Sequence, residues 1–391
     1  MRILMILESE FPPDIRVENE IESLVEAGNF VIIACYAKKN EKLIEKKENH
    51  LIVRFPRSDF FKKKLSAACL TLPFYFVSWK KFLSKIVEKY QIEVIHIHDL
   101  PLAKVGYLLK KKYNLHFVLD MHENFPAAVK IYKHTNTLQG KILSPYKKWL
   151  SYENSYVKEA DRIIVVVEEA KTRFNKLIDD KKIYIVSNTL NLNSFDEIET
   201  KKNIESNILF FAGMINQHRG LQIVLKAISI LKERQIDIIF QIAGTGSYVS
   251  ELKKIVTNLD IEKNVIFLGW KTRKEISSLL SQASFTIIPH LKSEHTDTTI
   301  PHKIFQYMYA NRFIISSNCK PLERIINKTN AGLIYQSNSA NDLADKIELG
   351  IAEISKEDFS LSTRKIVEDK YNWKIDGENL VRLYNSLGNN G

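Results

Sequence analysis

The stretch Thr296–Ser317, TDTTIPHKIFQYMYANRFIISS, combines the local signals of a loop, a helix and a strand. Pro301 is expected at the first position of the helix, because its missing N–H would have no intrahelical partner there. One apolar face follows, made by Ile304, Phe305, Met308 and Tyr309. A turn at residues 311–312 leads into a buried strand. Because a helix start carries free N–H groups and a partial positive charge, the stretch predicts an anion site beside a parallel sheet.

Composition places the chain among folded globular proteins. Its 391 residues correspond to two or three domains of about 150 residues each. Apolar residues make up 45% and charged residues 26%, an ordinary balance that argues against a disordered chain. The formal net charge of +11 attracts nucleic acid, anionic lipid and phosphorylated ligands. Composition by itself does not choose among these partners.

Cysteine usage and the N-terminus indicate a reducing compartment. Cys35, Cys69 and Cys319 are scattered and form neither a C-x-x-C pair nor a metal-ligand spacing. The N-terminal run MRILMILESEF is too short in its apolar part for a secretory signal, so we expect a first strand there. No uncharged apolar run of about 18 residues occurs, and no transmembrane helix is expected.

Short apolar runs alternate with amphipathic segments in two successive series. The first series opens with a strand, a helix and a strand, a βαβ unit, at Arg2–Leu7, Val17–Ala27 and Phe30–Ala34. The clearest elements of the second series are strands at Ile208–Ala212 and Phe285–Ile288 and a helix at Leu221–Glu233. A polar segment, residues 193–206, separates the two series. We predict two doubly wound α/β domains, residues 1–195 and 205–373.

One segment of the first domain combines basic and large apolar residues. Phe60–Lys85 reads FFKKKLSAACLTLPFYFVSWKKFLSK, and Pro73 divides it into two expected helices. Lysines beside aromatic side chains bind anionic membrane surfaces, so the segment predicts a membrane-docking surface. A nearby basic patch at Lys141–Trp149 adds to it. The alternative is a helix pair packed on the sheet with its lysines in solvent.

Polar residues follow several predicted strands, where open parallel sheets bind their ligands. In the first domain these residues are Glu8, Asp14, Arg16, His98, Asp99, His122 and Glu123. In the second domain they are Gly213, Arg219, Gly244, Gly246 and His290. Two such sets predict a ligand held between two domains. The cationic and glycine-rich members of the second set, together with Lys303, suit a diphosphate.

Each of these residues also has a purely structural interpretation. A lone histidine after a strand is most often structural, although the pairs His98–Asp99 and His122–Glu123 weaken that interpretation. Gly244 and Gly246 otherwise form a tight strand-to-helix turn, since a lone G-x-G is a weak signal. Arg219 is otherwise a solvated surface charge.

Several common mechanisms lack their sequence motifs. The chain contains no G-x-x-x-x-G-K-[ST], no G-x-G-x-x-G after its first strand and no G-x-S-x-G. These absences argue against a P-loop enzyme, a dinucleotide site in the first domain and a serine-hydrolase elbow. No Asp-x-Asp occurs, which argues against a carboxylate-held metal on a diphosphate, and no His/Cys cluster has zinc spacing. We therefore expect no metal and no other cofactor.

The order of the motifs resembles that of the retaining glycosyltransferases of family 4 over nearly the whole chain. The first domain carries FPPDIRVENEIESLVEAG, HIHDLP and LDMHENFP, and the second carries FAGMINQHRGLQIVLKAI, IAGTGSYVSELKKI, VIFLGW and PHKIFQYMYANRFIISSN, followed by YNW. The resemblance implies the GT-B fold, in which two Rossmann-like doubly wound domains face a central cleft and a C-terminal helix, here from about residue 374 to 391, crosses back to the first domain. It also implies metal-independent sugar transfer, with retention, from a nucleotide sugar on the second domain to an acceptor on the first.

The resemblance assigns roles to individual residues. Arg219 stands where the family has a diphosphate-binding lysine, and Met214 where many members have a second basic residue. His122 resembles the family histidine that approaches the donor sugar, and a neutral imidazole there would accept from a sugar hydroxyl. We expect catalytic roles for His122 and Arg219. The other expected donor-binding residues are Gly213, Gly244, Gly246, His290, Asp297, Thr298, Thr299, Lys303 and Gln306, and the expected acceptor-side residues are Asp14, Arg16, His98, Asp99 and Glu123.

The chain departs from the family's Glu-x7-Glu signature, because Thr298 and Gln306 stand at the two glutamate positions. Gln306 can accept from ribose hydroxyls through its carbonyl, at a loss of about 1–2 kcal/mol relative to a charge-assisted bond. Thr298 offers no carboxylate, although Asp297 is adjacent. The backbone N–H groups of residues 297–300 are expected to bind sugar hydroxyls or phosphate instead.

The expected function is hexose transfer to a lipid-linked or saccharide acceptor during synthesis of capsule, O-antigen or exopolysaccharide. The expected location is the cytoplasm, with Phe60–Lys85 on the anionic inner face of the cell membrane. Two alternatives stay open, a nucleotide-sugar epimerase of the same fold and a sugar-nucleotide-binding protein with weakened catalysis. No nucleic acid partner is expected, since no recognised binding motif accompanies the positive charge.

Overall fold

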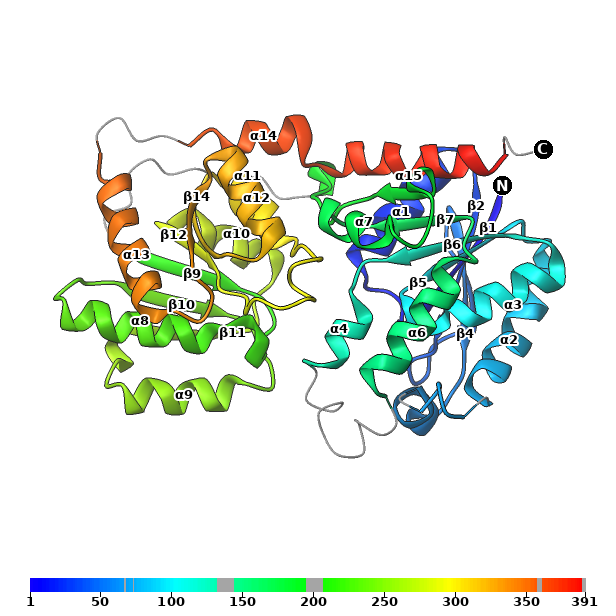
Figure 1. Cartoon of the computed structure of the whole chain (residues 1–391), viewed down its shortest axis with the longest axis horizontal. Coiled ribbons are helices and arrows are strands. Elements are labelled where there is room, and N and C mark those ends of the chain that lie inside the picture. The colour runs from blue at the N-terminus through cyan, green and yellow to red at the C-terminus, as the bar shows by residue number, and fades with distance from the viewer. Residues whose placement is uncertain (67, 73, 132–143, 195–206, 357–360, 389–391) are drawn as a thin grey trace. The chain divides into compact units, whose positions relative to one another are not determined.

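The computed structural model (Figure 1) describes residues 1–391 except 67, 73, 132–143, 195–206, 357–360 and 389–391. The chain divides into two compact units, Met1–Asn188 with Lys374–Gly391, and Thr189–Trp373. Most of the predicted linker, residues 193–206, lies outside the described residues. Part of the Lys141–Trp149 patch lies outside them as well.

The first unit contains one eight-stranded sheet in the order β3-β4-β2-β1-β5-β6-β7-β8. Its described strands pair in parallel, except that β3 and β4 are antiparallel. Central strands are buried on both faces, as in Ile3–Ile6 of β1, which explains their unbroken apolar runs. The strands are β1 Arg2–Glu10, β2 Phe30–Tyr36, β3 Ile44–Lys46, β4 His50–Phe55, β5 Val94–His98, β6 His116–Met121, β7 Arg162–Val165 and β8 Ile183–Ile185.

Helices connect these strands and cover the sheet (Figure 1). They are α1 Ile15–Glu26, a π-helix Phe61–Leu65, α2 Phe74–Tyr90, α3 Ala103–Tyr113, α4 Phe125–Val129, α6 Tyr146–Val157, α7 Glu168–Phe174 and the C-terminal α15 Trp373–Gly388. The C-terminal helix packs on this unit, as predicted. Its Tyr384 hydroxyl lies 2.7 Å from Nδ1 of His96 on β5, and Arg162 Nε donates to Ser386 Oγ at 2.8 Å.

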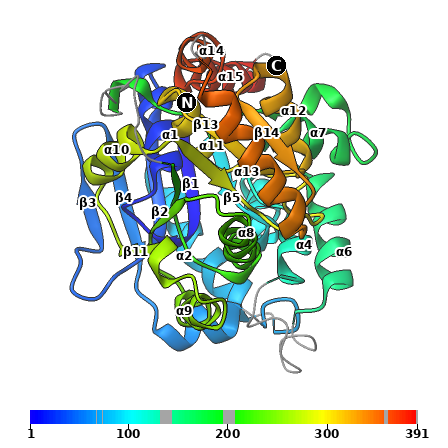
Figure 2. The ribbon, with the colours of Figure 1, turned by 90° about the vertical axis from the view of Figure 1, so that its left-hand side faces the viewer.

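The second unit contains a six-stranded sheet in the order β11-β10-β9-β12-β13-β14, with every described pairing parallel. Its strands are β9 Ile208–Ala212, β10 Ile239–Ala243, β11 Val265–Gly269, β12 Phe285–Ile288, β13 Phe313–Ser317 and β14 Gly332–Tyr335. Its helices are α8 Leu221–Glu233, α9 Val249–Asn258, α10 Arg273–Gln282, α11 Lys303–Tyr309, α12 Lys320–Thr329, α13 Ala340–Ile354 and α14 Thr363–Lys370. Helices α8 and α13 lie side by side (Figure 2).

The strand order of each sheet reverses at one place, which fixes where its ligands are expected. In the first unit the reversal lies between β1 and β5, and in the second it lies between β9 and β12. Open α/β sheets bind ligands beyond the carboxyl ends of the strands at such a switch point. The doubly wound architecture predicted for both domains is confirmed, and so are the C-terminal helix and the bounds of α8.

Three local predictions need correction. The sequence patterns do not predict strands β3 and β4, although the run Leu51–Phe55 is almost wholly apolar apart from Arg54. Helix α11 begins at Lys303 and not at Pro301. Its first amides are already bonded within the turn, Ile304 N to Pro301 O at 3.3 Å and Phe305 N to His302 O at 3.1 Å. The expected set of free N–H groups at this helix start is therefore reduced.

The basic aromatic segment Phe60–Lys85 divides into a buried face and an exposed face. Much of its apolar content lies in the core, with Tyr75, Trp79 and Leu83 fully buried. Trp79 packs against Tyr36 and Phe55, with ring centroids 5.1 and 4.8 Å apart. For these residues the helix packs on the sheet, as the alternative interpretation held. Within the described part of the chain, no helix is long and apolar enough to cross a membrane.

Candidate functional site

A cluster of charged side chains lies at the carboxyl ends of β5 and β6 in the first unit. Arg16 of α1 is at its centre and is only 5% exposed. Its guanidinium donates to both carboxylate oxygens of Asp120, at 3.0 and 3.1 Å, and to the carbonyl of Val186 at 3.1 Å. Its Nε also lies 3.1 Å from Glu20 Oε1. The donors of Arg16 thus tie α1 to β6 inside the unit, and its predicted role on the acceptor side stays a prediction.

Asp14 has a structural task as well. Its carboxylate accepts from the backbone N–H groups of Arg16 and Val17, at 3.1 and 3.2 Å, and so caps the N-terminus of α1. Both bonds use Oδ1, and Asp14 is partly exposed, so its place among the acceptor-side residues stays a prediction.

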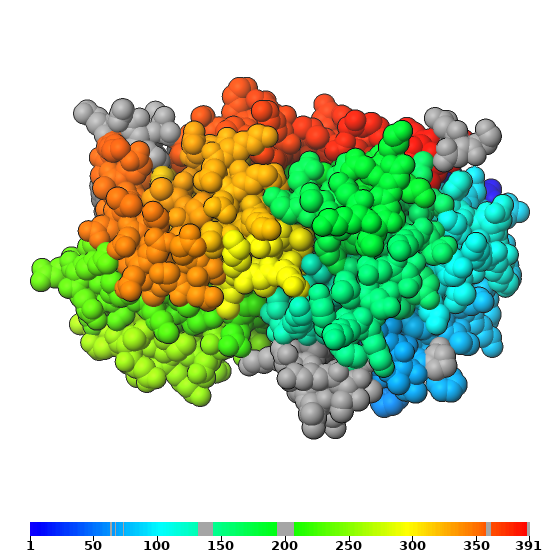
Figure 3. Space-filling view, viewed as in Figure 1, coloured from blue at the N-terminus to red at the C-terminus, as the bar shows by residue number. Residues whose placement is uncertain are grey.

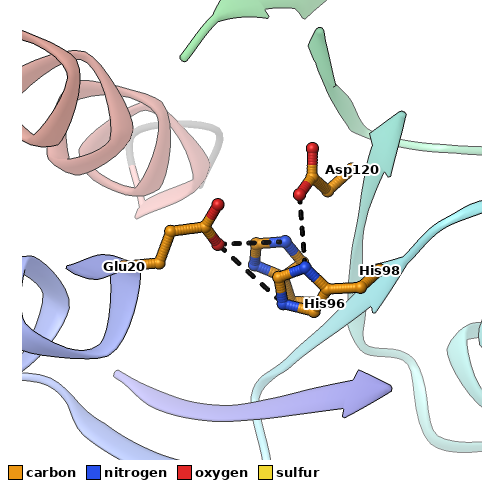
Figure 4. A group of neighbouring side chains, drawn as sticks. All are labelled: Glu20, His96, His98 and Asp120. Carbon is orange, nitrogen blue, oxygen red and sulfur yellow. Dashed lines mark hydrogen bonds and ion pairs between the residues drawn. The ribbon is translucent and has the colours of Figure 1, made fainter. Parts of the chain in front are cut away.

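Two stacked histidines of β5 lie next to this cluster (Figure 4). The rings of His96 and His98 have centroids 4.4 Å apart and planes 14° apart. His98 Nδ1 lies 3.2 Å from Asp120 Oδ2, and Glu20 Oε2 lies 3.8 Å from Nε2 of both rings. His98 is only 4% exposed and belongs to a buried network, and its predicted place on the acceptor side stays a prediction.

The network holds possible metal ligands, but their orientation does not fit an ion. One ligand atom from each of Glu20, His96, His98 and Asp120 lies within 4.8 Å of the others. An imidazole binds a metal along the lone pair in its ring plane, at about 2.0–2.1 Å. Two nearly parallel stacked rings cannot both aim at one point that close. We interpret the four side chains as a polar network that holds α1 on the sheet. Burial raises the pKa of Glu20 to about 7, against the opposing effect of Arg16.

His122 and Asp99 form the accessible part of this region, with side chains 27% and 29% exposed. His122 Nε2 lies 3.0 Å from Asp99 Oδ2, and its Nδ1 lies 3.5 Å from Asp120 Oδ2. Burial by itself lowers the pKa of His122, but Asp99 and Asp120 outweigh it and hold that pKa well above its usual value. This direction opposes the expectation of a neutral imidazole that accepts from a sugar hydroxyl, because the two neighbouring carboxylates stabilise the protonated ring. Glu123 lies next to it and is half-buried.

In the second unit a cavity of about 390 Å³ opens at the ends of β9, β10 and β11. It is lined by Ala212, Gly213, Met214, Ala243, Gly244, Thr245, Trp270, Lys271, Arg273, Ile276, Ser277 and Gln306. Of the predicted donor-binding residues, the structure brings Gly213, Gly244 and Gln306 together here. None of the described residues that line it is acidic.

The glycines are required by a close approach of two loops. Gly244 has φ +142°, and a Cβ added there would lie 1.9 Å from the carbonyl oxygen of Gly213. A Cβ on Gly246 would lie 2.1 Å from the carbonyl oxygen of Ile215. Only glycine allows the loop after β10 to lie this close to the loop after β9. Gly244 and Thr245 of this G-x-G line the cavity.

Three further predicted residues lie near one another beside this wall. Arg219 Nη1 lies 2.8 Å from His290 Nε2, and His290 is 4% exposed. Burial, reinforced by Arg219 and Lys303, holds the pKa of His290 well below its usual value, so the neutral ring accepts from Arg219 and orients it. Lys303 Nζ lies 3.9 Å from the ring centroid of Phe211 and close to Gly213. Burial and then Arg219 hold the pKa of Lys303 well below its usual value.

The predicted contribution of the loop before α11 needs correction. Asp297 N donates to Ser293 O at 2.9 Å and Thr298 N donates to His295 O at 3.2 Å, so neither amide points to a ligand. Thr298 and Thr299 donate through their hydroxyls to the carbonyls of residues 294 and 295. The carboxylate of Asp297 accepts from Lys320 N at the start of α12. These three residues hold the loop, and they are not among those that line the cavity.

The sequence did not predict four further residues that line the cavity, Trp270, Lys271, Arg273 and Ser277. Trp270 directly follows β11 and is 70% exposed, an unusual state for so large a side chain. The strand-end rule applied to VIFLGW would have identified it, because β11 neighbours β10 at the same edge of the sheet.

Comparison with known proteins gives matches over both units. The model described as Glycosyltransferase Family 4 matches residues 15–194, and that described as Glycosyl transferases group 1 matches residues 194–364. An uncharacterised glycosyltransferase of Bacillus subtilis is 25% identical over 51% of this chain and 52% of its own. An amylovoran biosynthesis glycosyltransferase of Erwinia amylovora is 25% identical over 44% of this chain and 43% of its own. The chain thus aligns with about half the length of these curated relatives.

Solved structures match the whole chain in fold. A sucrose-phosphate synthase from Thermosynechococcus elongatus has a TM-score of 0.78 and 16% identity, covering 99% of both chains. The Anabaena protein HepE in complex with UDP-glucose has a TM-score of 0.70 and 14% identity, covering 99% of this chain and 100% of its own. With adjoining family models that run from residue 15 to residue 364 and two sheets of the expected doubly wound kind, the chain belongs to the retaining glycosyltransferases of family 4, which have the GT-B fold.

Proposed function

We propose that this chain transfers a hexose from a nucleotide sugar to a lipid-linked or saccharide acceptor, with retention, in the synthesis of a cell-envelope polysaccharide such as capsule, O-antigen or exopolysaccharide. Its family supports the class of reaction. The name of the Erwinia relative, which refers to amylovoran biosynthesis, supports a polysaccharide product. The observation that carries the proposal is the cavity at the carboxyl ends of β9, β10 and β11 in the second sheet. None of its described lining residues is acidic, and Arg219 and Lys303 lie beside its wall.

In this proposal the cavity binds the nucleotide. The exposed ring of Trp270 stacks on the base, and the side-chain carbonyl of Gln306 accepts from a ribose hydroxyl. The diphosphate lies against the Gly213 loop, within reach of Lys303 and Arg219. Because the Anabaena protein HepE, which shares this fold, holds UDP-glucose in its solved structure, a uridine nucleotide is the first candidate.

Cationic side chains stabilise the negative charge that develops on the leaving diphosphate. Arg219 is held in place by the neutral ring of His290, and such a fixed cation stabilises a leaving group without reorganising during the reaction. The leaving diphosphate itself takes the proton of the acceptor hydroxyl. Because Arg219 and Lys303 neutralise it, we propose that transfer needs no metal and no other cofactor.

On the acceptor side of the first unit, Asp14, Asp99 and Glu123 are partly exposed, whereas Arg16 and His98 are buried. We propose that the three partly exposed carboxylates contact the acceptor and that His122 keeps its catalytic role. The carboxylates of Asp99 and Glu123 accept from acceptor hydroxyls, and the partly exposed ring of His122 lies beside Asp99. We propose that this edge of the first sheet receives the acceptor.

We also propose that the first unit acts on the cytoplasmic face of the cell membrane. Four large apolar side chains remain exposed among the described residues of the basic aromatic segment, Phe60 at 65%, Leu72 at 39%, Phe74 at 68% and Val77 at 60%. A second cavity of about 280 Å³ lies in the same region, lined by Phe55, Pro56, Arg57, Ser78, Lys81, Phe82 and Lys85. Three cations with exposed apolar residues fit an anionic lipid surface. Lys62 is partly neutralised, because it pairs with Glu10 at 2.8 Å.

The donor proposal is tested first by nucleotide binding. Thermal shift and calorimetry with UDP, GDP, dTDP and CMP, each with and without EDTA, are expected to identify one tight ligand that binds in EDTA. Arg219→Gln should weaken binding, whereas Arg234→Gln, which alters ion pairs with Asp345 and Glu348, should not. If none of the four nucleotides binds, the proposed function is wrong.

A panel of labelled nucleotide sugars then separates the alternatives. Transfer of label to a lipid or saccharide fraction in EDTA supports the proposal. Conversion of the donor into another nucleotide sugar without an acceptor would instead indicate an epimerase. Binding without any reaction over the whole panel would indicate a binding protein with weakened catalysis.

Membrane docking is tested by flotation with phosphatidylcholine vesicles that contain or lack phosphatidylglycerol. The variant Phe74→Ser/Lys81→Gln/Lys85→Gln should lose flotation with the anionic vesicles. A matched control is Leu349→Ser on α13, whose atoms are orange in Figure 3, because Leu349 is 54% exposed. Equal flotation of both variants and the unchanged protein would contradict the docking surface.

A further inference from the structure

Asp99 has a backbone conformation that is normally open only to glycine. Its φ is +63° and its ψ is 161°. Other residues with positive φ, such as Asn114 and Asn330, have ψ of 51° and 37°, which is the ordinary left-handed region. A side chain in the region of Asp99 is strained and persists only where the surroundings enforce it. The presence of Asp99 instead of glycine therefore indicates that the contacts of its side chain matter at this position.

In this strained conformation the carboxylate of Asp99 lies next to Nε2 of His122. The backbone N–H of Asp99 donates to Asp120 O at 2.9 Å, which fixes the residue at the end of β5 against β6. From this position Asp99 Oδ2 reaches to 3.0 Å of His122 Nε2. The residue after Asp99 begins the 3-10 helix Leu100–Leu102, so the chain turns away as soon as the carboxylate is placed.

The other side of the ring is held less closely. His122 Nδ1 is buried and lies 3.5 Å from Asp120 Oδ2, which is beyond a good hydrogen bond. Asp120 is also shared, since it accepts two bonds from Arg16. The ionisable groups that interact electrostatically with His122 are Asp99, Asp120, Glu20 and His96. Asp99 is the one in closest contact with the ring and the only carboxylate among them that is partly open to solvent.

We infer that Asp99 is a positioning residue for His122. The strained backbone of Asp99 brings its carboxylate to Nε2 of His122 and fixes the ring as a hydrogen-bond donor to that carboxylate at the carboxyl edge of the first sheet. The assignment of that ring to sugar transfer rests on the proposed function. The contact between the two side chains does not, and it can be measured without any substrate.

The test is a titration of His122 by NMR in the full-length chain, with its resonance assigned by its loss in His122→Gln. In the unchanged protein His122 should titrate above the other histidines that reach solvent. Asp99→Asn keeps the shape and removes the charge, and it should lower the pKa of His122 by about one unit or more. The matched control is Asp260→Asn, which also has positive φ at +52° but lies in the second unit on an exposed turn, and it should leave the titration unchanged.

A second variant separates strain from charge. Asp99→Gly relieves the backbone and should raise the melting temperature, while it lowers the pKa of His122 as Asp99→Asn does. Both variants should also reduce sugar transfer at least tenfold, and Asp260→Asn should not. An unchanged His122 titration in Asp99→Asn would overturn the inference, whatever happens to activity. If the unchanged protein transfers no sugar, the proposed function fails, but the titration still decides the role of Asp99.

Discussion

Replacing Lys303 with methionine should make the unliganded protein more stable and the nucleotide complex weaker. The ammonium group is desolvated, is repelled by Arg219, and forms no ion pair with any described carboxylate. Methionine has a similar length and no charge. Removing an uncompensated polar group gains about 1–3 kcal/mol, and losing the contact with Phe211 costs about 0.5–2 kcal/mol. A net gain of about 1 kcal/mol corresponds to an increase in melting temperature of roughly 2–4 °C.

The same ammonium group is the one that a diphosphate would pair with. A hydrogen bond to a charged group contributes about 1.5–3 kcal/mol, which corresponds to a loss of about 10- to 150-fold in affinity when it is removed. The assay is calorimetry with the best-binding nucleoside diphosphate at low salt, together with thermal unfolding of the unliganded protein. The matched control is Lys254→Met on α9, whose side chain is 71% exposed and which should change neither quantity.

The lowered pKa of Lys303 makes the stability of the folded protein depend on pH. Because the folded state binds this proton more weakly than the unfolded chain does, stability rises with pH between the lowered pKa and about 10.4. Lys303→Met should lack that rise. An anion bound beside Lys303 raises the pKa again, so nucleotide binding should take up protons, which calorimetry in buffers of different ionisation enthalpy detects. A variant that is less stable than the parent, or one whose affinity falls less than threefold, would refute this account of the site.

Three further outcomes are expected. Gly244→Ala should destabilise the second unit by at least about 1–3 kcal/mol in urea unfolding, because its Cβ would meet the Gly213 carbonyl at 1.9 Å, whereas Gly28→Ala, with nothing within 4 Å, should cost only about 1 kcal/mol for its positive φ. Trp270→Ala should lower nucleotide affinity by about 1–3 kcal/mol with unchanged melting temperature, and equal affinity would remove the stacking role. In the folded protein the pKa of Glu20 is raised to about 7, so the stability that its protonated form contributes is complete below about pH 4.5 and is lost as the pH rises through 7. Glu20→Gln should reduce this decline in the free energy of unfolding, measured by urea unfolding at pH 5 and pH 8.

Elements with a strong periodic pattern were predictable from the sequence. Helix α8 has the predicted bounds because its apolar face is continuous and Gly220, with φ +76°, sets its start. Strand β3 was not predictable in the same way. It has only three residues, two of them charged, and it exists because β4 offers an edge for antiparallel pairing. An edge of this kind is a property of the assembled sheet and leaves no periodic signal in the strand itself.

The strand-end rule found candidate residues but not the directions of their side chains. Arg16 and Asp120 are 104 positions apart in the chain, and only the fold shows that they neutralise each other. His98 and His122 both follow the same kind of apolar run, yet one is buried beneath the edge and the other is partly open. Partner choice of this kind depends on the register of β5 against β6, in which His98 lies opposite Asp120. A single sequence does not encode that register in a form that can be read directly.

The two switch-point edges differ in charge balance, and this difference indicates which ligand each one suits. In the first unit Arg16 is balanced by Glu20 and Asp120, and His122 is balanced by Asp99, so the exposed groups are paired and best suited to neutral hydroxyls. In the second unit Lys303 and Arg219 repel each other beside a neutral histidine, and the nearby Glu275 is already bonded to Lys271 and to the start of α10. The charge of Lys303, which no described carboxylate neutralises, destabilises the unliganded protein and is relieved by an anion. The stretch Thr296–Ser317 therefore contributes to the site through Lys303 and Gln306 of its helix, while Asp297, Thr298 and Thr299 hold the loop before that helix.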